Sequence, residues 1–247
     1  MIEAVTFDYW ETLVSEGRGI DAEEDGSMRS RQLRIWSAIL HDAGFPADDV
    51  AIEQAFTFNW EVFHERWRAN VQYGPKEATP TMCEFLGIDP PPEVVAELVT
   101  SFEQVGRDAP LQLAPGAEEC LHALKESGAR IGIICDVGMT SSPTLRARLQ
   151  GFGVLHFFDH WSFSDEVGCF KPFPAVFEHA MAGLGVTDPS RLAHVGDGRR
   201  TDMAGALAMG MTAVRYTHFN DPPPETGPDG DAVIDDHRKL PATLGRA

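Results

Sequence analysis

Four aspartates follow, or lie just after, short apolar runs that have the length of buried strands. They are Asp8, Asp136, Asp197 and Asp202. An ionised carboxylate at the end of a buried strand is unfavourable unless a counter-charge pairs with it. Ligands bind at the carboxyl edge of a parallel sheet, so a carboxylate there could act as a nucleophile or as a metal ligand. Taken singly, each aspartate could also cap a turn or a helix.

The four aspartates converge on one edge if the predicted sheet is parallel and forms one layer. Four carboxylates cannot all ionise within a few ångströms of one another without compensation. A hard divalent cation held by oxygen ligands, together with a lysine, would provide that compensation, and Lys171 is the candidate lysine. We therefore expect Mg²⁺ with few protein ligands, which suits a site that handles phosphate.

Strands and helices alternate outside residues 18–107, which predicts an α/β fold with a doubly wound parallel sheet. The expected strands are residues 4–7, 129–134, 157–163, 192–195, 212–216 and 232–234. The expected helices between them are residues 117–127, 142–149, 173–184 and 201–209. Polar segments at residues 15–27 and 220–230 indicate loops.

Residues 18–107 carry helical patterns alone, and they interrupt the alternation directly after the first strand. The expected helices are residues 28–43, 48–70, 81–86 and 92–105. An aromatic stripe at Phe56, Trp60, Phe63 and Trp67 follows helical spacing and indicates a helix–helix core. The predicted domains are therefore an α/β core of residues 1–17 and 108–247 and an inserted helical lobe of residues 18–107 over the sheet's carboxyl edge.

Composition excludes several classes of partner. The 247-residue chain has a formal net charge of -18, which argues against nucleic acid and anionic membranes. The negative net charge does not exclude a small anionic substrate, because a bound cation can make the electrostatic potential positive within one site. The four cysteines show no metal-binding or disulfide spacing, and no signal peptide or membrane-spanning run is evident. These features predict a cytoplasmic protein, and they carry no signal about its oligomeric state.

Four motifs together resemble those of the haloacid dehalogenase superfamily in order and spacing. They are Phe7-Asp8 with Thr12-Leu13, the strand that ends at Cys135, Lys171-Pro172, and Gly196-Asp197 with Asp202 followed by Gly205-Ala206. The inserted helical lobe is similar to the cap of the first subfamily. The resemblance covers nearly the whole core and implies a Rossmann-like core with hydrolase activity.

The resemblance also implies a role for each matching residue. Asp8 would be the nucleophile that attacks phosphorus and forms an aspartyl-phosphate. Mg²⁺ would be bound by Asp8, Asp197 and the backbone carbonyl of Trp10. Asp202 would be a further carboxylate of this metal site, direct or indirect. Lys171 would neutralise charge on the nucleophile and on the transferring phosphoryl group. The implied activity is a magnesium-dependent phosphatase that acts on a small phosphorylated metabolite.

Two positions depart from the phosphatase pattern. Trp10 stands where the family's phosphatases carry a second aspartate as general acid and base, and an indole cannot transfer a proton. The adjacent Glu11 is an alternative proton donor. Cys135 replaces the usual serine or threonine, and a thiol is a weak donor to phosphate. The neighbouring Asp136 would repel a dianion unless it is protonated or turned away. We expect Cys135 and Asp136 to lie at the substrate.

The dehalogenase branch of the superfamily supplies the main alternative. Trp10 resembles its aromatic residue two positions after the nucleophile, and residues 29–33 resemble a stretch whose first arginine, here Arg29, contacts halide and so would bind the substrate. Arg29 could instead belong to a solvated basic helix face. The intact pair of Asp197 and Asp202 favours the metal-dependent phosphatase. The alternatives are a metal-free 2-haloacid dehalogenase and a catalytically weakened binding protein of the same fold.

Overall fold

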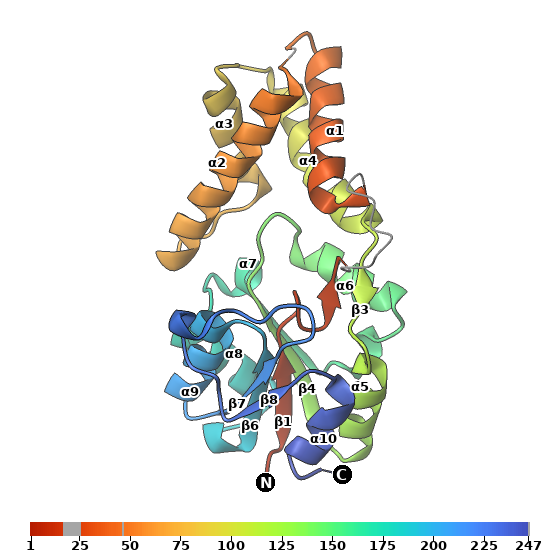
Figure 1. Ribbon diagram of the computed structural model, residues 1–247, viewed down its shortest axis with the longest axis vertical. Coiled ribbons are helices and arrows are strands. Elements are labelled where there is room, and N and C mark those ends of the chain that lie inside the picture. Colours follow the sequence, from red (N-terminus) through yellow and green to blue (C-terminus); the bar gives the residue numbers. More distant parts are fainter. Residues whose placement is uncertain (17–25, 46, 247) are drawn as a thin grey trace. The chain divides into compact units, whose positions relative to one another are not determined.

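The computed structural model describes residues 1–16, 26–45 and 47–246, which form two compact units (Figure 1). The α/β unit comprises Met1–Gly17, Leu111–Asp136 and Leu149–Ala247. The helical unit comprises Arg18–Pro110 and Val137–Arg148. The predicted boundary between residues 17 and 18, and residues 17–25 of the loop predicted at 15–27, lie outside the described residues.

A six-stranded sheet forms the centre of the α/β unit, and all its neighbouring strands are parallel. From edge to edge, the strands are β5 (His160–Phe163), β4 (Arg130–Cys135), β1 (Ala4–Phe7), β6 (Leu192–Gly196), β7 (Thr212–Tyr216) and β8 (Ala232–Ile234). Every residue of β1 and β6 is buried, as expected for a parallel sheet that is covered on both faces. The predicted α/β fold is confirmed.

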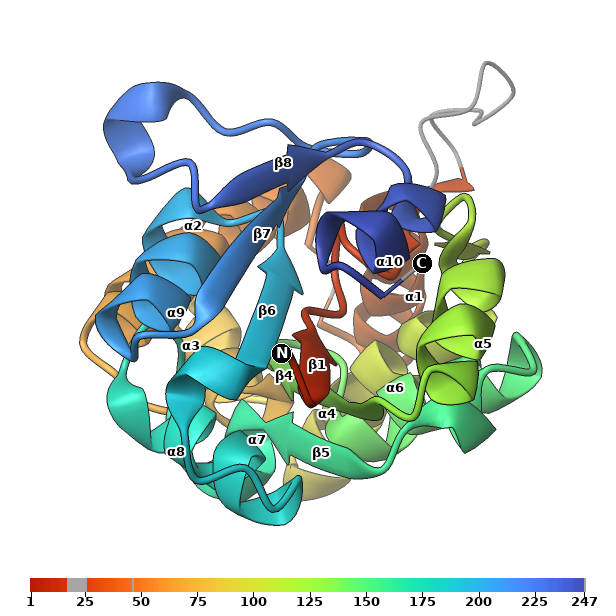
Figure 2. The same cartoon turned by 90° about the horizontal axis from the view of Figure 1, so that it is seen from below.

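Helices cover both faces of this sheet (Figure 2). One face carries α8 (Pro174–Gly183) and α9 (Ala204–Ala208), and the other carries α5 (Ala117–Glu126) and α10 (Leu240–Thr243). A short helix, α7 (Ser164–Val167), follows β5. The core beneath α8 contains its buried residues and those of the central strands. They include Ala4, Ile134, Val176, Phe177, Ala180 and Leu192.

A two-stranded antiparallel ribbon lies where the chain leaves and re-enters the α/β unit. Its strands are β2 (Val14–Ser15) and β3 (Gln112–Leu113), with Val14 opposite Leu113. The sequence did not predict this ribbon, because two residues per strand are too few to show an alternating pattern. The ribbon ties together two segments that are about a hundred residues apart in sequence.

The helical unit contains α1 (Met28–Asp42), α2 (Asp49–Arg68), α3 (Pro75–Leu86) and α4 (Pro92–Asp108). Side-chain caps at Ser27 and Asp48 begin α1 and α2 by accepting the backbone N–H of the residue three positions on. Trp36, Phe56 and Phe102 pack with ring centroids 5.2–6.0 Å apart, so the apolar faces of three helices meet there. The predicted aromatic stripe is only partly core, because Trp60 is 39% exposed.

Two features of the helical unit differ from expectation. The predicted helix at residues 81–86 begins earlier, at Pro75, because the Glu77 side chain accepts the Gly74 N–H and Pro75 has no N–H that needs an acceptor. Pro80 lies inside this helix instead of before it. Residues 137–148, expected in the α/β core, group with the helical unit. The Glu103 side chain on α4 accepts hydrogen bonds from the Ser141 N–H and, at 2.6 Å, from the Thr144 hydroxyl.

The remaining helix, α6 (Ser142–Gly151), crosses from the helical unit back into the α/β unit. Its two ends therefore belong to different parts of the chain. Among the helices of residues 1–16, 26–45 and 47–246, none is both long and apolar enough to cross a membrane.

Candidate active site

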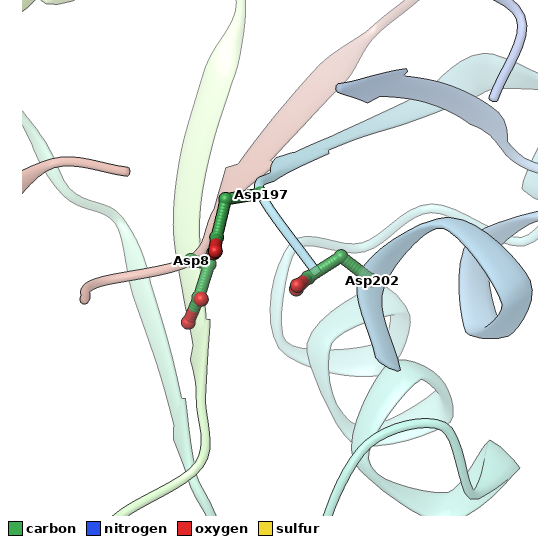
Figure 3. A group of neighbouring side chains, drawn as sticks. All are labelled: Asp8, Asp197 and Asp202. Atoms are coloured by element: carbon green, nitrogen blue, oxygen red, sulfur yellow. The ribbon is translucent and has the colours of Figure 1, made fainter. Parts of the chain in front are cut away.

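Three aspartates meet at the carboxyl ends of the central strands (Figure 3). Asp8 follows β1 and Asp197 follows β6, and these two strands are hydrogen-bonded neighbours. Asp202 comes from the wide helical turn Arg199–Met203. One oxygen from each of the three carboxylates lies within 4.8 Å of the others, and all three residues are buried. The sheet therefore concentrates negative charge at one point, as the sequence predicted for these three residues.

Lys171 supplies the positive charge at this cluster. Its amino group lies 2.7 Å from Oδ1 of Asp8 and 2.7 Å from Oδ1 of Asp202, and it also donates to the carbonyl of Ile134 at 3.1 Å. Burial of this lysine opposes its charge, but the two aspartates outweigh burial and raise the pKa of Lys171 well above its ordinary value. Lys171 is therefore a buried cation that forms ion pairs with both Asp8 and Asp202.

Each of the two carboxylate oxygens of Asp202 has two donors. Lys171 and His194 donate to Oδ1, at 2.7 and 2.9 Å. The N–H of Gly198 and the hydroxyl of Thr201 lie 2.9 and 3.1 Å from Oδ2. Burial would raise its pKa, but the charge of Lys171 holds the pKa of Asp202 below the ordinary value. A carboxylate occupied in this way is suited to hold its neighbours in place.

Asp8 and Asp197 are less fully compensated. Both hydrogen bonds to Asp8, from Lys171 and from the Tyr9 N–H at 2.7 Å, fall on Oδ1. Burial raises the pKa of Asp8 well above the ordinary value, although Lys171 opposes the shift. Burial, with the charge of Asp202, raises the pKa of Asp197 to about 7. Two buried carboxylates with raised pKa values are typical of a site in which a bound metal ion supplies the missing positive charge.

The turn after Asp8 leaves one more oxygen available. The N–H groups of Leu13 and Val14 both donate to the carbonyl of Tyr9, so neither engages the carbonyl of Trp10. The carboxylates of Asp8 and Asp197 are oxygen ligands of the kind that suits Mg²⁺, and the carbonyl of Trp10 is a further candidate. The indole of Trp10 packs edge-on against Tyr9, with ring centroids 5.0 Å apart.

Glu11 has an unusual backbone conformation next to Trp10. Its φ of 53° lies in the left-handed region, which residues other than glycine rarely adopt. Its Oε1 accepts a hydrogen bond from the Ser15 hydroxyl at 3.0 Å, whereas its buried Oε2 has no hydrogen-bond partner. One carboxylate oxygen is therefore available for a proton or a ligand.

Cys135 and Asp136 end β4 at the same edge of the sheet. Burial, followed by the charge of Asp8, raises the pKa of the Cys135 thiol well above its ordinary value, so the sulfur stays neutral. The Asp136 carboxylate accepts the backbone N–H of Lys171 at 2.8 Å. The Asp136 carboxylate therefore points toward the backbone of Lys171. This engagement agrees with the expectation that Asp136 is turned away from an anionic substrate.

Asn220 joins the site although nothing in the sequence marked it. Its amide donates to Oδ2 of Asp197 at 2.7 Å, from a segment expected to be only a surface loop. The neighbouring loop is anchored by two buried arginines, Arg199 and Arg215, which pair with Asp221 and Asp229. Periodicity cannot reveal such a residue, because its position depends on these long-range ion pairs.

Arg29 is placed in the helical unit, where α2 engages its guanidinium. It donates to the carbonyl of Glu53 at 3.0 Å and to the hydroxyl of Thr57 at 2.9 Å. The guanidinium carbon also lies 5.6 Å from the centroid of the Phe56 ring. Burial lowers the pKa of Arg29 from its ordinary value, with the charge of Glu53 opposing the shift. These contacts join α1 to α2.

Comparison with known proteins settles the family. Residues 2–210 match the model of the haloacid dehalogenase-like hydrolases. The chain belongs to this family. A glyceraldehyde 3-phosphate phosphatase of Methanopyrus kandleri is 28% identical over 247 residues, which cover 97% of this chain and 96% of that protein.

Solved structures of this hydrolase family share the fold. A phosphatase from Thermococcus onnurineus superposes with a TM-score of 0.67 at 22% identity, over 99% of this chain and 98% of its own. A 2-haloacid dehalogenase from Pseudomonas syringae pv. Tomato DC3000 gives a TM-score of 0.71 at 24% identity, over 100% and 99%. Because phosphatase and dehalogenase superpose about equally well, the fold does not separate the two reactions.

Proposed function

We propose that this hydrolase is a magnesium-dependent phosphatase of a small phosphorylated metabolite and that Asp8 is its nucleophile. The observation that carries the proposal is the pair of buried carboxylates Asp8 and Asp197, for which Lys171 is only a partial counter-charge. A metal-free dehalogenase gains nothing from a second buried carboxylate with a pKa raised to about 7. The similarity to a glyceraldehyde 3-phosphate phosphatase over nearly the full length supports the same reaction class.

The residues present fit a magnesium ion. Asp8, Asp197 and the carbonyl of Trp10 would be its protein ligands, and water would complete the shell. When bound, Mg²⁺ supplies charge stabilisation to the phosphoryl oxygens. Asp202, with its four donors, would act indirectly by holding Lys171. This assignment refines the expectation that Asp202 belongs to the metal site.

The chain's own residues account for the rest of the reaction. A carboxylate oxygen of Asp8 would attack phosphorus, forming the Asp8–phosphoryl bond as the bond to the leaving oxygen breaks. Lys171 lies 2.7 Å from Oδ1 of Asp8, where it orients the nucleophile and stabilises the added negative charge. Water would then attack the same phosphorus, releasing phosphate and restoring Asp8.

The leaving oxygen needs a proton that Trp10 cannot give. Glu11 is the proposed donor, because its Oε2 is buried without a hydrogen-bond partner. Without an efficient acid, the enzyme would favour phosphates whose leaving group departs unaided. Cys135 and Asp136 would line the phosphate position. Arg29 would support substrate binding by fixing the helical unit.

We further propose that the helical unit is the substrate-selecting cap and that the α/β unit carries the chemistry. The four cysteines are free and buried, which supports a reducing cytoplasm as the location. A small anionic substrate fits the cationic centre at Lys171, whereas the chain's net charge of -18 disfavours nucleic acid.

An assay with p-nitrophenyl phosphate, with and without Mg²⁺, tests the proposal. We expect magnesium-dependent turnover that Asp8→Asn abolishes. The control is Asp188→Asn, which removes a surface aspartate that caps a short turn elsewhere and is expected to retain turnover. Absence of phosphate release with both aryl and alkyl phosphates would contradict the proposal.

The second candidate is a metal-free 2-haloacid dehalogenase, which the aromatic Trp10 favours. In that reaction an oxygen of Asp8 would displace halide from carbon, and water would hydrolyse the ester. Halide release from 2-chloropropionate in the presence of a chelator would support it. Inactivity in both assays, with retained Mg²⁺ binding, would leave the third alternative, a binding protein of the same fold.

A further inference from the structure

A buried hydroxyl–imidazole pair lies directly behind the acidic cluster. Thr6 on β1 and His194 on β6 are register partners in adjacent strands, and both side chains are fully buried. Nδ1 of His194 lies 3.0 Å from the Thr6 hydroxyl, and Nε2 lies 2.9 Å from Oδ1 of Asp202. The imidazole therefore bridges the middle of the sheet and the carboxylate that holds Lys171.

The partners of His194 determine where its proton lies. Oδ1 of an ionised Asp202 only accepts hydrogen bonds, so Nε2 must carry the proton that points at it. The ring is fully buried and the cation of Lys171 lies against the same carboxylate oxygen, so we expect the imidazole to be neutral. In a neutral ring with a protonated Nε2, Nδ1 is an acceptor, and it lies closer to the Thr6 hydroxyl, at 3.0 Å, than the other acceptor, the Ala193 carbonyl at 3.4 Å. The hydrogen bonds thus run in one direction, from Thr6 through His194 to Asp202.

The surroundings leave the carboxylate little freedom. A Cβ atom at Gly196 would lie 2.3 Å from Cγ of Asp202, so the carboxylate rests directly on the strand backbone. The Phe177 ring packs edge-on against His194 at 5.5 Å between centroids. His194 and Lys171 donate to the same oxygen of Asp202, so a shift of the imidazole changes the hydrogen bond that places the lysine.

We propose that Thr6 and His194 are positioning residues, which orient Asp202 and, through it, hold Lys171 against Asp8. The inference rests on the proposed function only in that Asp8 and Lys171 carry the reaction. Neither Thr6 nor His194 would touch the substrate. Their loss should therefore lower the rate of the chemical step and leave substrate binding almost unchanged.

Two amide substitutions at His194 separate positioning from simple core filling. His194→Gln places an amide donor near the Nε2 position, whereas His194→Asn places it near Nδ1, out of reach of Asp202. We expect kcat for p-nitrophenyl phosphate to fall about 10- to 100-fold in the Asn variant, with KM changed less than about threefold. The Gln variant should recover most of the loss. Equal losses in both folded variants would overturn the proposal.

Thr6 offers a milder test that preserves the core. Thr6→Val keeps the shape and removes the hydroxyl, and we expect kcat to fall about fivefold from the loss of one hydrogen bond. Thr6→Ser should restore it. The matched control is His160→Gln on the edge strand β5, where the imidazole contacts His179 and Gln is expected to leave kcat unchanged. An unchanged rate in Thr6→Val would contradict the role of Thr6.

A spectroscopic measurement distinguishes failure of this inference from failure of the proposed function. In ¹⁵N-histidine-labelled full-length protein, we expect the His194 signals of a neutral ring with a protonated Nε2, and we expect Thr6→Val to shift the Nδ1 resonance. A protonated Nδ1 would overturn the inference whatever the activity. An inactive wild-type protein with the expected signals would overturn the phosphatase assignment and the kinetic role, while the hydrogen-bonded chain would stand.

Discussion

The amino group of Lys171 lies 2.7 Å from Oδ1 of Asp8, and these side chains are 2% and 11% exposed. If either member of a buried ion pair is removed, the other is left as an uncompensated buried charge, and the folded protein is destabilised. Lys171 also pairs with Asp202, so one cation balances two buried charges. Folding and the proposed catalytic role of Asp8 therefore depend on the same contact.

Replacing Lys171 by Met should destabilise the protein strongly as well as remove activity. The change leaves the buried carboxylates of Asp8 and Asp202 without their cation, and we expect the free energy of unfolding to fall by about 3–5 kcal/mol. Urea denaturation measures this loss. The control is Lys125→Met, which breaks the partly exposed pair with Asp159 and should change stability by no more than about 1 kcal/mol. Equal effects of the two substitutions would contradict the interpretation.

Binding of Mg²⁺ should strengthen as the pH rises through 7. The pKa of Asp197 is raised to about 7 in the metal-free chain, so below that pH the ion must displace a proton. We expect the apparent Kd at pH 6 to be about tenfold weaker than at pH 8. Titration calorimetry at the two pH values measures the ratio. Asp197→Asn should weaken binding and flatten its pH dependence; an unchanged slope would assign the proton to another group.

A carboxylate at position 10 should broaden the range of leaving groups. Trp10→Asp introduces a potential general acid, so we expect hydrolysis of alkyl phosphates to increase by up to about 10²-fold relative to p-nitrophenyl phosphate. Glu11→Gln should do the reverse if Glu11 supplies the proton. The ratio of kcat/KM for the two substrates is the measurement. A ratio that neither substitution changes would show that protonation does not limit the rate.

Stability should fall in mild acid because of His237, whose side chain is fully buried between Tyr216 and Phe7. Burial lowers its pKa to about 4, against about 6.5 in an unfolded chain. The unfolded state therefore binds the proton more tightly, and stability is lost as the pH falls from about 6.5 to 4, by about 3 kcal/mol.

His237→Gln is the matched variant for this effect, because an amide donor can keep the hydrogen bond to the Thr12 carbonyl. We expect the stability of the variant to lack this part of the acid dependence. The comparison is of unfolding free energies for both proteins at pH 7 and pH 4.5. Parallel acid losses in the two proteins would exclude His237 as the cause.

Local patterns were sufficient to predict the elements that carry the cluster. Short strand-like segments that alternate with helical patterns predicted all six strands of the sheet, and Asp8 and Asp197 follow two of them. Their proximity then follows from parallel pairing of β1 with β6. Lys171 was predicted from charge balance, and it does lie between two of the aspartates.

The partners that complete the site depend on contacts that no local pattern encodes. Asn220 reaches Asp197 because ion pairs far along the chain fix its loop. His194 reads from the sequence as one polar residue in an apolar strand, and its function depends on Thr6 across the sheet. For Asp136, the sequence predicted a carboxylate at this edge of the sheet. It did not predict the direction of the side chain, which accepts a hydrogen bond from the backbone N–H of Lys171.

The grouping of residues 137–148 with the helical unit has a consequence for protein engineering. A chimera that exchanges only residues 18–110 would leave behind the segment whose Ser141 and Thr144 donate to Glu103. The transplanted helices would then lose the hydrogen-bond donors to Glu103. The recipient would keep its own residues 137–148, whose native helical partners had been replaced. With the proposed role of the helical unit as the substrate-selecting cap, exchange of specificity between relatives would require a two-piece graft, whose second piece begins one residue after Asp136.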